Sequence, residues 1–471
     1  MKRYLFFLMT VMIMVQLGCT MAPKYNQPAL PVPDAWPNGG AAITSQAEDV
    51  RREPVAYTIS WHDFFVDERL KKVIALALEN NRDLRVAILN IEKTRAQYQI
   101  QRAALLPNVN AGGTHVELRV PRDFSPTGEP MQTRAYVAGL GTSAYELDLF
   151  GRVRSMKEQT LEHYLATEEA RRSTQIALVA AVANTYLTLA GDHELLTLAQ
   201  DTLKNEEAKF DLIRIRYDAG LSSELDLRQV QTRVEAARVD IARYTQLVAM
   251  DENALMFLVG STVPQELLPK ELETITLVKE ISSGLPSETL LRRPDIQQAE
   301  HMLRGANANI GAARAAFFPR ITLVSGAGYA SVRLNDLFHP QSFAWAYAPM
   351  ISMPIFDGGI NLANLNASKA ERDILVAQYE KAIQVAFREV ADALAQKRTV
   401  GDQIAAQQSM VDATAKTYSL SDGRYKAGID NYLSVLDAHR SLYSAQQGLI
   451  TIRLAALTNS VTLYKVLGGG E

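Results

Sequence analysis

The hexapeptide Arg-Ala-Ala-Leu-Leu-Pro at residues 102–107 returns as Arg-Ala-Ala-Phe-Phe-Pro at residues 314–319. A second motif, Arg-Tyr-Asp-Ala-Gly at 216–220, returns as Arg-Tyr-Lys-Ala-Gly at 424–428. The copies lie about half a chain apart, which indicates tandem duplication of one large unit rather than a short solenoid repeat. Each half is predicted to contain a helix, two amphipathic strands and two long helices, in that order. This order predicts an α+β architecture with strands of membrane length.

The repeats and their flanks define the predicted organisation of the chain. The mean hydropathy of −0.08 argues against a bundle of transmembrane helices, and the net charge of −3 gives no electrostatic case for nucleic acid. The one strongly apolar run lies at the N-terminus behind two basic residues, as in a signal peptide, and it is too short to span a bilayer. The predicted segments are a signal peptide at 1–18, an extended tether at 19–57, a first repeat at 58–265, a linker at 266–285 and a second repeat at 286–467.

Cys19 is the only cysteine, so no intrachain disulfide is possible. It follows the apolar run directly and is preceded by Gly18, which resembles a bacterial lipobox. We therefore expect Cys19 to carry a covalent lipid after cleavage, and Thr20 rather than Asp favours the outer membrane by the same resemblance. The alternative is an ordinary secretory signal that contains a cysteine. The Pro-rich stretch that follows is expected to be extended.

Long helices are predicted after the strands of each half. Between residues 151 and 219 there is no proline and one internal glycine, Gly191, so a helix over most of this span would be about 100 Å long. The next segment has apolar residues at alternating spacings of three and four, which predicts left-handed coiled-coil packing. This seam is interpreted as packing rather than a cofactor site. Its members are Leu227, Val230, Val234, Ala237, Ile241, Tyr244 and Val248, and in the second half Val435, Ala438, Leu442, Ala445, Leu449, Ile452 and Ala456.

Each pair of long helices is joined by a short turn. Gly220 and Gly428 suit the left-handed position that follows a helix. Ser222 and Asp430 are the predicted N-caps of the following helices. Each half should therefore contain a long antiparallel helical hairpin with a tight tip.

Four segments alternate with period two, at 108–120, 134–149, 320–331 and 342–356. A soluble hairpin would alternate in the same way. Their lengths reach the roughly ten residues that a tilted transmembrane strand needs.

Aromatic residues in the last of these segments support the membrane interpretation. Phe343, Trp345 and Tyr347 lie on one face, as members of an interfacial girdle would. Four strands cannot close a barrel, and open strand edges are not tolerated in lipid. The chain must therefore oligomerise if these strands span a membrane, although the strand number alone does not separate a dimer from a trimer.

Seven sequence blocks, in order, resemble an outer membrane factor of the TolC superfamily, in the NodT-type lipoprotein branch that includes the OprM efflux channel. They are Glu-Asn-Asn-Arg-Asp-Leu at 79–84, Glu-Leu-Asp-Leu-Phe-Gly-Arg at 146–152, Tyr-Leu-Ala-Thr-Glu at 164–168, Arg-Arg-Pro-Asp-Ile at 292–296, the stretch 306–319 that ends in Phe-Phe-Pro, Pro-Ile-Phe-Asp-Gly-Gly at 354–359 and Leu-Gly-Gly-Gly at 467–470.

The resemblance implies a homotrimer in which four strands from each chain form a 12-stranded β-barrel in the outer membrane. Twelve long helices would continue it as a periplasmic α-barrel. The expected partners are a periplasmic adaptor and an inner membrane transporter, usually of the proton-driven RND type. Export would be passive. The resemblance implies no enzyme activity, and no cofactor beyond the lipid on Cys19.

A polar stripe on the last helix is the candidate gate. In the heptad frame Leu433, Asp437 and Arg440 lie opposite the seam, and Ser444, Gln447 and Thr451 extend this face. Such a face is usually only solvated surface. The resemblance matches these positions, with Tyr425, to the periplasmic aperture.

The gate hypothesis assigns a role to each residue. Asp437 and Arg440 would pair near the tip, Tyr425 would hydrogen-bond across neighbouring helices, and Leu433 would narrow the pore. The first-half equivalents are Leu225, Gln229 and Thr232, so the ionic pair occurs in one half only.

No sequence pattern supports catalysis. The seven histidines are scattered, and neither metal-binding nor nucleotide-binding signatures occur. His62 and Asp63 are adjacent but lack a nucleophile pattern, so a surface or packing role is expected.

The sequence is also compatible with three other functions. A metal-exporting relative is one, although only Met350 and Met353 are close in sequence and packing explains both. A type I secretion channel and a non-conducting coiled-coil spacer are others.

Overall fold

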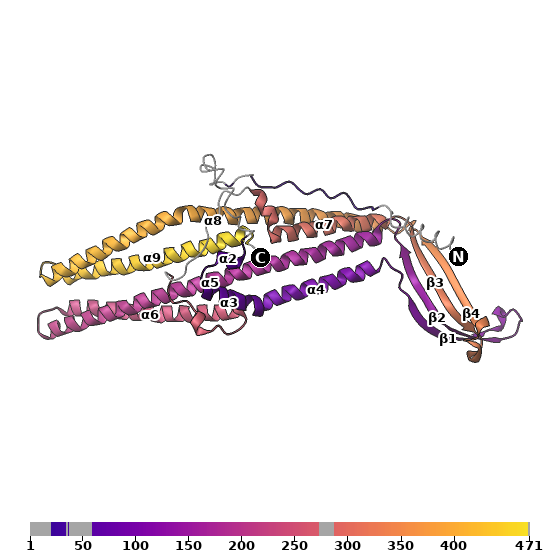
Figure 1. Ribbon diagram of the computed structural model, residues 1–471, viewed down its shortest axis with the longest axis horizontal. Coiled ribbons are helices and arrows are strands. Elements are labelled where there is room, and N and C mark those ends of the chain that lie inside the picture. Colours follow the sequence, from indigo (N-terminus) through magenta and orange to yellow (C-terminus); the bar gives the residue numbers. More distant parts are fainter. Residues whose placement is uncertain (1–19, 34–35, 37–58, 273–286, 470–471) are drawn as a thin grey trace. The chain divides into compact units, whose positions relative to one another are not determined.

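The computed structural model describes residues 20–33, 36, 59–272 and 287–469 (Figure 1). The predicted signal peptide and Cys19 lie outside these residues, as do most of the tether and of the linker.

The predicted order of elements occurs in both halves. After a short helix α2 (Trp61–Phe64), each half runs from helix to two strands to two long helices, and α5 and α8 are each 67 residues long. In the first half these elements are α3 (Glu68–Asn80), α4 (Arg82–Ala103), β1 (Asn110–Val120), β2 (Met131–Leu147), α5 (Arg152–Asp218) and α6 (Glu224–Val259). In the second half they are α7 (Pro294–Ala315), β3 (Arg320–Ser331), β4 (Phe343–Ser352), α8 (Ile360–Lys426) and α9 (Tyr432–Val466).

Two strand boundaries differ from the sequence prediction by more than two residues. β2 begins at Met131, earlier than the predicted 134, because its start pairs with Val120 at the end of β1. β4 ends at Ser352, short of the predicted 356, and Pro354 follows. Proline has no N–H to donate to a ladder, which is consistent with the early end.

The four strands form one antiparallel sheet in the order β1-β2-β3-β4. Glycines face one another at its centre, where Gly139 pairs with Gly328. A Cβ added at Gly139 would lie 2.6 Å from the carbonyl oxygen of Ala327, so only glycine fits here. Within the chain β1 and β4 each pair on one side, and their outer edges are left without a strand partner among the described residues.

The described residues cluster into two compact units that cut across the sequence halves. One contains residues 20–29, 90–168 and 298–380, including the whole sheet. The other contains residues 30–33, 36, 59–89, 169–272, 287–297 and 381–469, including the helical hairpins. Each unit therefore takes equivalent pieces from both copies of the repeat.

In the sheet-containing unit, the N-terminal segment 20–29 lies in extended form against helices. The side chain of Arg314 donates to the carbonyl of Met21, and that of Asn307 donates to the carbonyl of Pro23. A Cβ on Gly311 would lie 2.7 Å from the backbone nitrogen of Ala22, so the segment approaches α7 closely.

In the hairpin unit, the predicted apolar seams are confirmed as packing faces. Val230, Val234, Ala237 and Tyr244 on α6 are buried, as are Val435, Ala438, Ala445 and Leu449 on α9, and the other predicted seam residues are half-buried. Figure 1 shows α5 with α6, and α8 with α9, as antiparallel hairpins.

Candidate functional site

The two hairpin tips have the same backbone geometry. Gly220 and Gly428 have φ angles of 73° and 72°, which confirms their predicted left-handed conformation. The N–H of Leu221 donates to the carbonyl of Arg216 at 2.7 Å, and that of Ile429 donates to the carbonyl of Arg424 at 3.0 Å. These are Schellman closures, so the duplicated motif ends each long helix in the same way.

The predicted N-caps were wrong by one residue in both tips. Ser223, not Ser222, caps α6, and it forms a capping box with Asp226. Asn431, not Asp430, caps α9. Asp430 instead accepts two hydrogen bonds from Arg424, at 2.6 and 2.9 Å, and this pair closes the α8–α9 turn.

Beneath the tips lies a hydrophobic cluster built from all four long helices. Its buried members are Ile213 on α5, Val230 on α6, and Tyr432, Val435 and Leu436 on α9. Phe210, Leu227, Tyr418 and Tyr425 pack against them. The cluster joins the hairpin of the first half to that of the second.

The candidate gate residues Leu433, Asp437 and Arg440 lie exposed on α9, opposite its buried face. Leu433 keeps 47% of its surface exposed. Ser444 and Thr451 continue this face, but Gln447 does not, because its amide donates to the hydroxyl of Tyr244 on α6 at 2.9 Å. The exposed face is therefore interrupted at Gln447.

Within one chain, the gate residues do not make the contacts that the gate hypothesis assigns to them. No ion pair joins Asp437 to Arg440 in the described part of the chain. Tyr425 packs its ring against Tyr432, with centroids 5.1 Å apart, and lies 5.7 Å from the guanidinium of Arg216. Tyr425 thus connects the two tips through its ring.

The first-half equivalents of the gate residues carry no charge. Leu225 is 67% exposed, Thr232 is exposed, and Gln229 is half-buried. The charged pair on the outward face of α9 therefore has no counterpart on α6.

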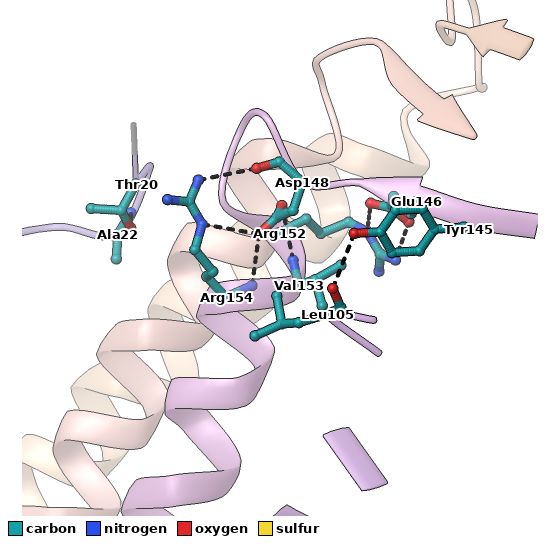
Figure 2. A network of polar contacts seen from close by, with 9 residues as sticks. All are labelled: Thr20, Ala22, Leu105, Tyr145, Glu146, Asp148, Arg152, Val153 and Arg154. Carbon is teal, nitrogen blue, oxygen red and sulfur yellow. Dashed lines mark hydrogen bonds and ion pairs between the residues drawn. The ribbon is translucent and has the colours of Figure 1, made fainter. Parts of the chain in front are cut away.

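A second polar network lies where strand β2 passes into helix α5 (Figure 2). Glu146 accepts two hydrogen bonds from Arg152, at 2.9 and 2.7 Å, and pairs with Arg320 at 2.7 Å. Asp148 accepts from the backbone N–H groups of Val153 and Arg154, and so caps the first turn of α5. The hydrogen bonds and charge of Glu146 raise the pKa of Arg152 above its usual value.

This junction borders a cavity of about 410 Å³ that is also lined by Phe318, Pro319 and Asp357. Asp357 accepts from the N–H groups of Gly359 and Asn361 at 2.9 Å each, and these bonds lower its pKa. The carboxylates of Asp148 and Asp357 thus each accept backbone N–H groups near the start of a long helix, α5 and α8 respectively. The arrangement is well suited to fix the direction of each helix relative to its strand.

The predicted aromatic girdle forms a row along β4. Phe343, Trp345 and Tyr347 are exposed on the same face, at 57%, 74% and 62%. Because a strand rises about 3.4 Å per residue, the row extends over roughly 13 Å. Phe343 contacts Tyr329, which also contacts Phe338, so aromatic rings gather where β3 and β4 are connected.

Sequence reasoning missed two groups of polar residues. Glu146 and Arg152 begin and end the sequence block at 146–152, but the sequence does not predict the contact between them. Glu206 on α5 and His439 on α9 form a buried pair that no local pattern indicated. His62 stacks on Trp61, with ring centroids 3.6 Å apart, as expected of a packing role.

In the described part of the chain, no three His, Cys, Asp or Glu side chains are grouped where they could hold a metal ion. Cys19, the predicted lipid-anchor residue, lies outside the described residues.

Comparisons with known proteins identify relatives over nearly the whole chain. A family model described as outer membrane efflux protein matches residues 73–261 and again residues 285–469. The toluene efflux pump outer membrane protein TtgC and the antibiotic efflux pump outer membrane protein ArpC, both of Pseudomonas putida, are each 50% identical over 96% of this chain and 93% of their own length.

Solved structures give the same result at the level of the fold. A membrane protein from Pseudomonas aeruginosa is 40% identical, with a TM-score of 0.90, over 96% of this chain and 98% of that one. The open state of the MtrE outer membrane channel of Neisseria gonorrhoeae is 38% identical, with a TM-score of 0.85, over the same shares of the two chains.

Proposed function

Because this chain belongs to the outer membrane efflux protein family, we propose that it is the exit duct of an RND-type drug and solvent pump, gated at the tips of its helical hairpins. The protein is the outer membrane channel of a tripartite efflux pump. Three chains contribute their four strands to a 12-stranded barrel in the outer membrane, and their long helices continue it as a helical barrel.

The cargo is proposed from the relatives. Two proteins with half of their residues in common with this chain are named for antibiotic and for toluene efflux. Small, largely apolar toxic compounds are therefore the proposed cargo. Metal-ion efflux and type I secretion are the alternatives, and neither has a specific observation in its favour among the described residues.

The proposed partners are a periplasmic adaptor and an RND-type transporter in the inner membrane. Channels of this family work with adaptor and pump components. Energy would come from the transporter, because the described part of this chain offers no nucleotide-binding or catalytic arrangement. Cys19 is the proposed lipid attachment site, on the strength of its position after the apolar run.

The observation that carries the gate is the exposed face of α9. Leu433, Asp437 and Arg440 project away from the buried seam within ten residues of the Asn431 cap. A face with one apolar and two oppositely charged groups, repeated by threefold symmetry, would place a narrow charged ring around the pore. One exposed pair contributes only about 0–1 kcal/mol, but a ring of pairs between protomers could bias a closed state.

Single-channel conductance in planar bilayers tests this gate. The native trimer is expected to show small, mostly closed steps, and Asp437→Ala with Arg440→Ala is expected to enlarge them. The matched control is Glu224→Ala with Arg228→Ala, which removes an exposed acid–base pair from α6 and leaves the net charge unchanged. Large native steps, or no change in the gate variant, would rule out a gate at these residues.

A further inference from the structure

A buried carboxylate–histidine contact connects the last helix to the first long helix below the tips. The ring nitrogen Nδ1 of His439 on α9 lies 2.7 Å from a carboxylate oxygen of Glu206 on α5. The Glu206 side chain is 1% exposed and that of His439 is 10% exposed. Carboxylates are almost never buried to this degree unless they are paired.

All four long helices provide groups around this carboxylate. Lys209 on α5 lies 3.6 Å from Glu206, and its ammonium lies 5.0 Å from the ring of Tyr418 on α8. The ring of His439 lies 5.0 Å from the same Tyr418 ring. Arg233 on α6 and Tyr432 on α9 also interact electrostatically with Glu206. The pair is thus the polar centre of the tip region.

The charge state of this centre follows from its surroundings. Burial alone would raise the pKa of Glu206, but His439, Lys209 and Arg233 outweigh it and the pKa is lowered. The short contact to His439 is poorly aligned for a hydrogen bond, and neither carboxylate oxygen has another well-aligned donor. Glu206 therefore depends on nearby positive charge. Removing one partner of such a pair leaves an uncompensated buried charge, which is strongly destabilising locally.

The position of His439 connects this centre to the exposed face of α9. His439 lies two residues after Asp437 and one before Arg440, and successive helical residues are about 100° apart. It therefore points inward while Asp437 and Arg440 point outward, in agreement with their burial. Any rotation of α9 that moved the outward residues would also pull His439 away from Glu206.

We propose that the Glu206–His439 pair is a latch that sets the rotation of α9 and so positions Leu433, Asp437 and Arg440. Glu206 and His439 are positioning residues in this scheme, and the scheme rests on the proposed gate.

The duplication supports a role beyond holding the fold. With the offset that relates Arg216 to Arg424, Glu206 corresponds to Thr414 and His439 to Gln231. Thr414 bonds to the carbonyls of its own helix, and Gln231 accepts from Arg228. A hairpin of the same design therefore forms without the pair. The carboxylate–histidine pair thus joins α5 to α9, the helix with the charged outward face, and the equivalent positions on α8 and α6 have no such pair.

The test measures conductance and amide hydrogen exchange on the full-length trimer. Glu206→Gln, which keeps the shape of the side chain, is expected to raise open-channel occupancy and to speed exchange over residues 433–443 about tenfold. Glu207→Gln is the matched control, because Glu207 is the next residue on α5 and its pair with Arg238 is exposed. Exchanging the two residues, as Glu206→His with His439→Glu, should restore native conductance.

Three outcomes would overturn the latch. Unchanged exchange and conductance in Glu206→Gln is one. The second outcome is faster exchange with unchanged conductance in Glu206→Gln, while Asp437→Ala with Arg440→Ala does open the channel. The pair would then have a purely structural role. The third is loss of the trimer in both Glu206→Gln and His439→Gln. If the Asp437 and Arg440 variant has no effect but Glu206→Gln opens the channel, the pair does set the rotation of α9, and the proposed gate at Asp437 and Arg440 is wrong.

Discussion

Two carboxyl groups face each other where α5 passes α6. The charges of Asp192 and Asp251 influence each other, and one oxygen of Asp251 is buried without a hydrogen-bond partner. Burial, and then the charge of Asp192, raises the pKa of Asp251 to about 6. Burial also raises the pKa of Asp192. When both carboxyl groups ionise, two like charges must be held in partly buried positions, which costs free energy.

This pair predicts a pH dependence of stability. A carboxyl group whose pKa rises on folding stabilises the protein below its unfolded pKa near 4, and this contribution is lost as the pH rises through about 6. Asp251→Asn should therefore flatten the change in unfolding temperature between pH 4 and 7 and stabilise the protein at pH 7. We expect on the order of 1 kcal/mol after solvent screening.

Thermal unfolding at several pH values checks this expectation, with Glu252→Gln as the control that removes a neighbouring charge. An Asp251→Asn protein that keeps the native pH profile would show that the pKa of Asp251 is not raised on folding.

At the scale of elements, glycine at a helix end has two different uses in this protein. Gly260 follows α6 with a φ of 74°, and a Cβ there would lie 2.5 Å from the carbonyl oxygen of Asn80. The amide of Asn81 donates to the carbonyl of Leu258 at 2.8 Å, so the end of α6 is held tightly against the α3–α4 connection. Gly220 has the same backbone conformation, but its missing Cβ faces open space.

The two glycines therefore predict unequal costs of substitution. Gly220→Ala should cost about 1 kcal/mol, the strain of a left-handed alanine alone. Gly260→Ala should cost about 2–4 kcal/mol, because backbone atoms must also move. Chemical unfolding of the two variants measures the difference. Equal losses would mean that the α3–α4 connection moves aside without cost.

The connection between strand β2 and helix α5 is held by ion pairs and hydrogen bonds. Glu146 connects the end of β2 to Arg152 on α5 and to Arg320 at the start of β3. A barrel strand can transmit its direction to a helix only if the turn between them is stiff. In the first copy Asp148 and the ion pairs of Glu146 supply that stiffness, and in the second copy Asp357 caps the start of α8.

At the scale of the whole molecule, the open edges of the sheet require other chains. Four strands are too few to close a barrel, and the outer edges of β1 and β4 lack a strand partner among the residues that the structure describes. We expect the detergent-purified protein to have the native mass of a trimer and to migrate as a trimer in unheated electrophoresis samples. The heated sample is the control and should migrate as the single chain. Conductance from a monomeric fraction would contradict closure by three chains.

Much of this architecture follows from the sequence, because local patterns determine local structure. The duplicated motifs, the long proline-free runs and the period-two segments were enough to predict both hairpins, all four strands and the left-handed Gly220 and Gly428. The buried seams of α6 and α9 also followed from their spacing. Family membership, shown by the comparisons, agrees with the resemblance seen in the sequence blocks.

Tertiary structure alone decided which distant side chains meet. It replaced the predicted caps by Ser223 and Asn431, directed Gln447 to Tyr244, and brought His439 onto Glu206 from the other half of the chain. Periodicity specifies which face of a helix is buried, but not which residue of a neighbouring helix lies opposite. That choice depends on the axial register and rotation of packed helices, which are determined only when the whole core is assembled.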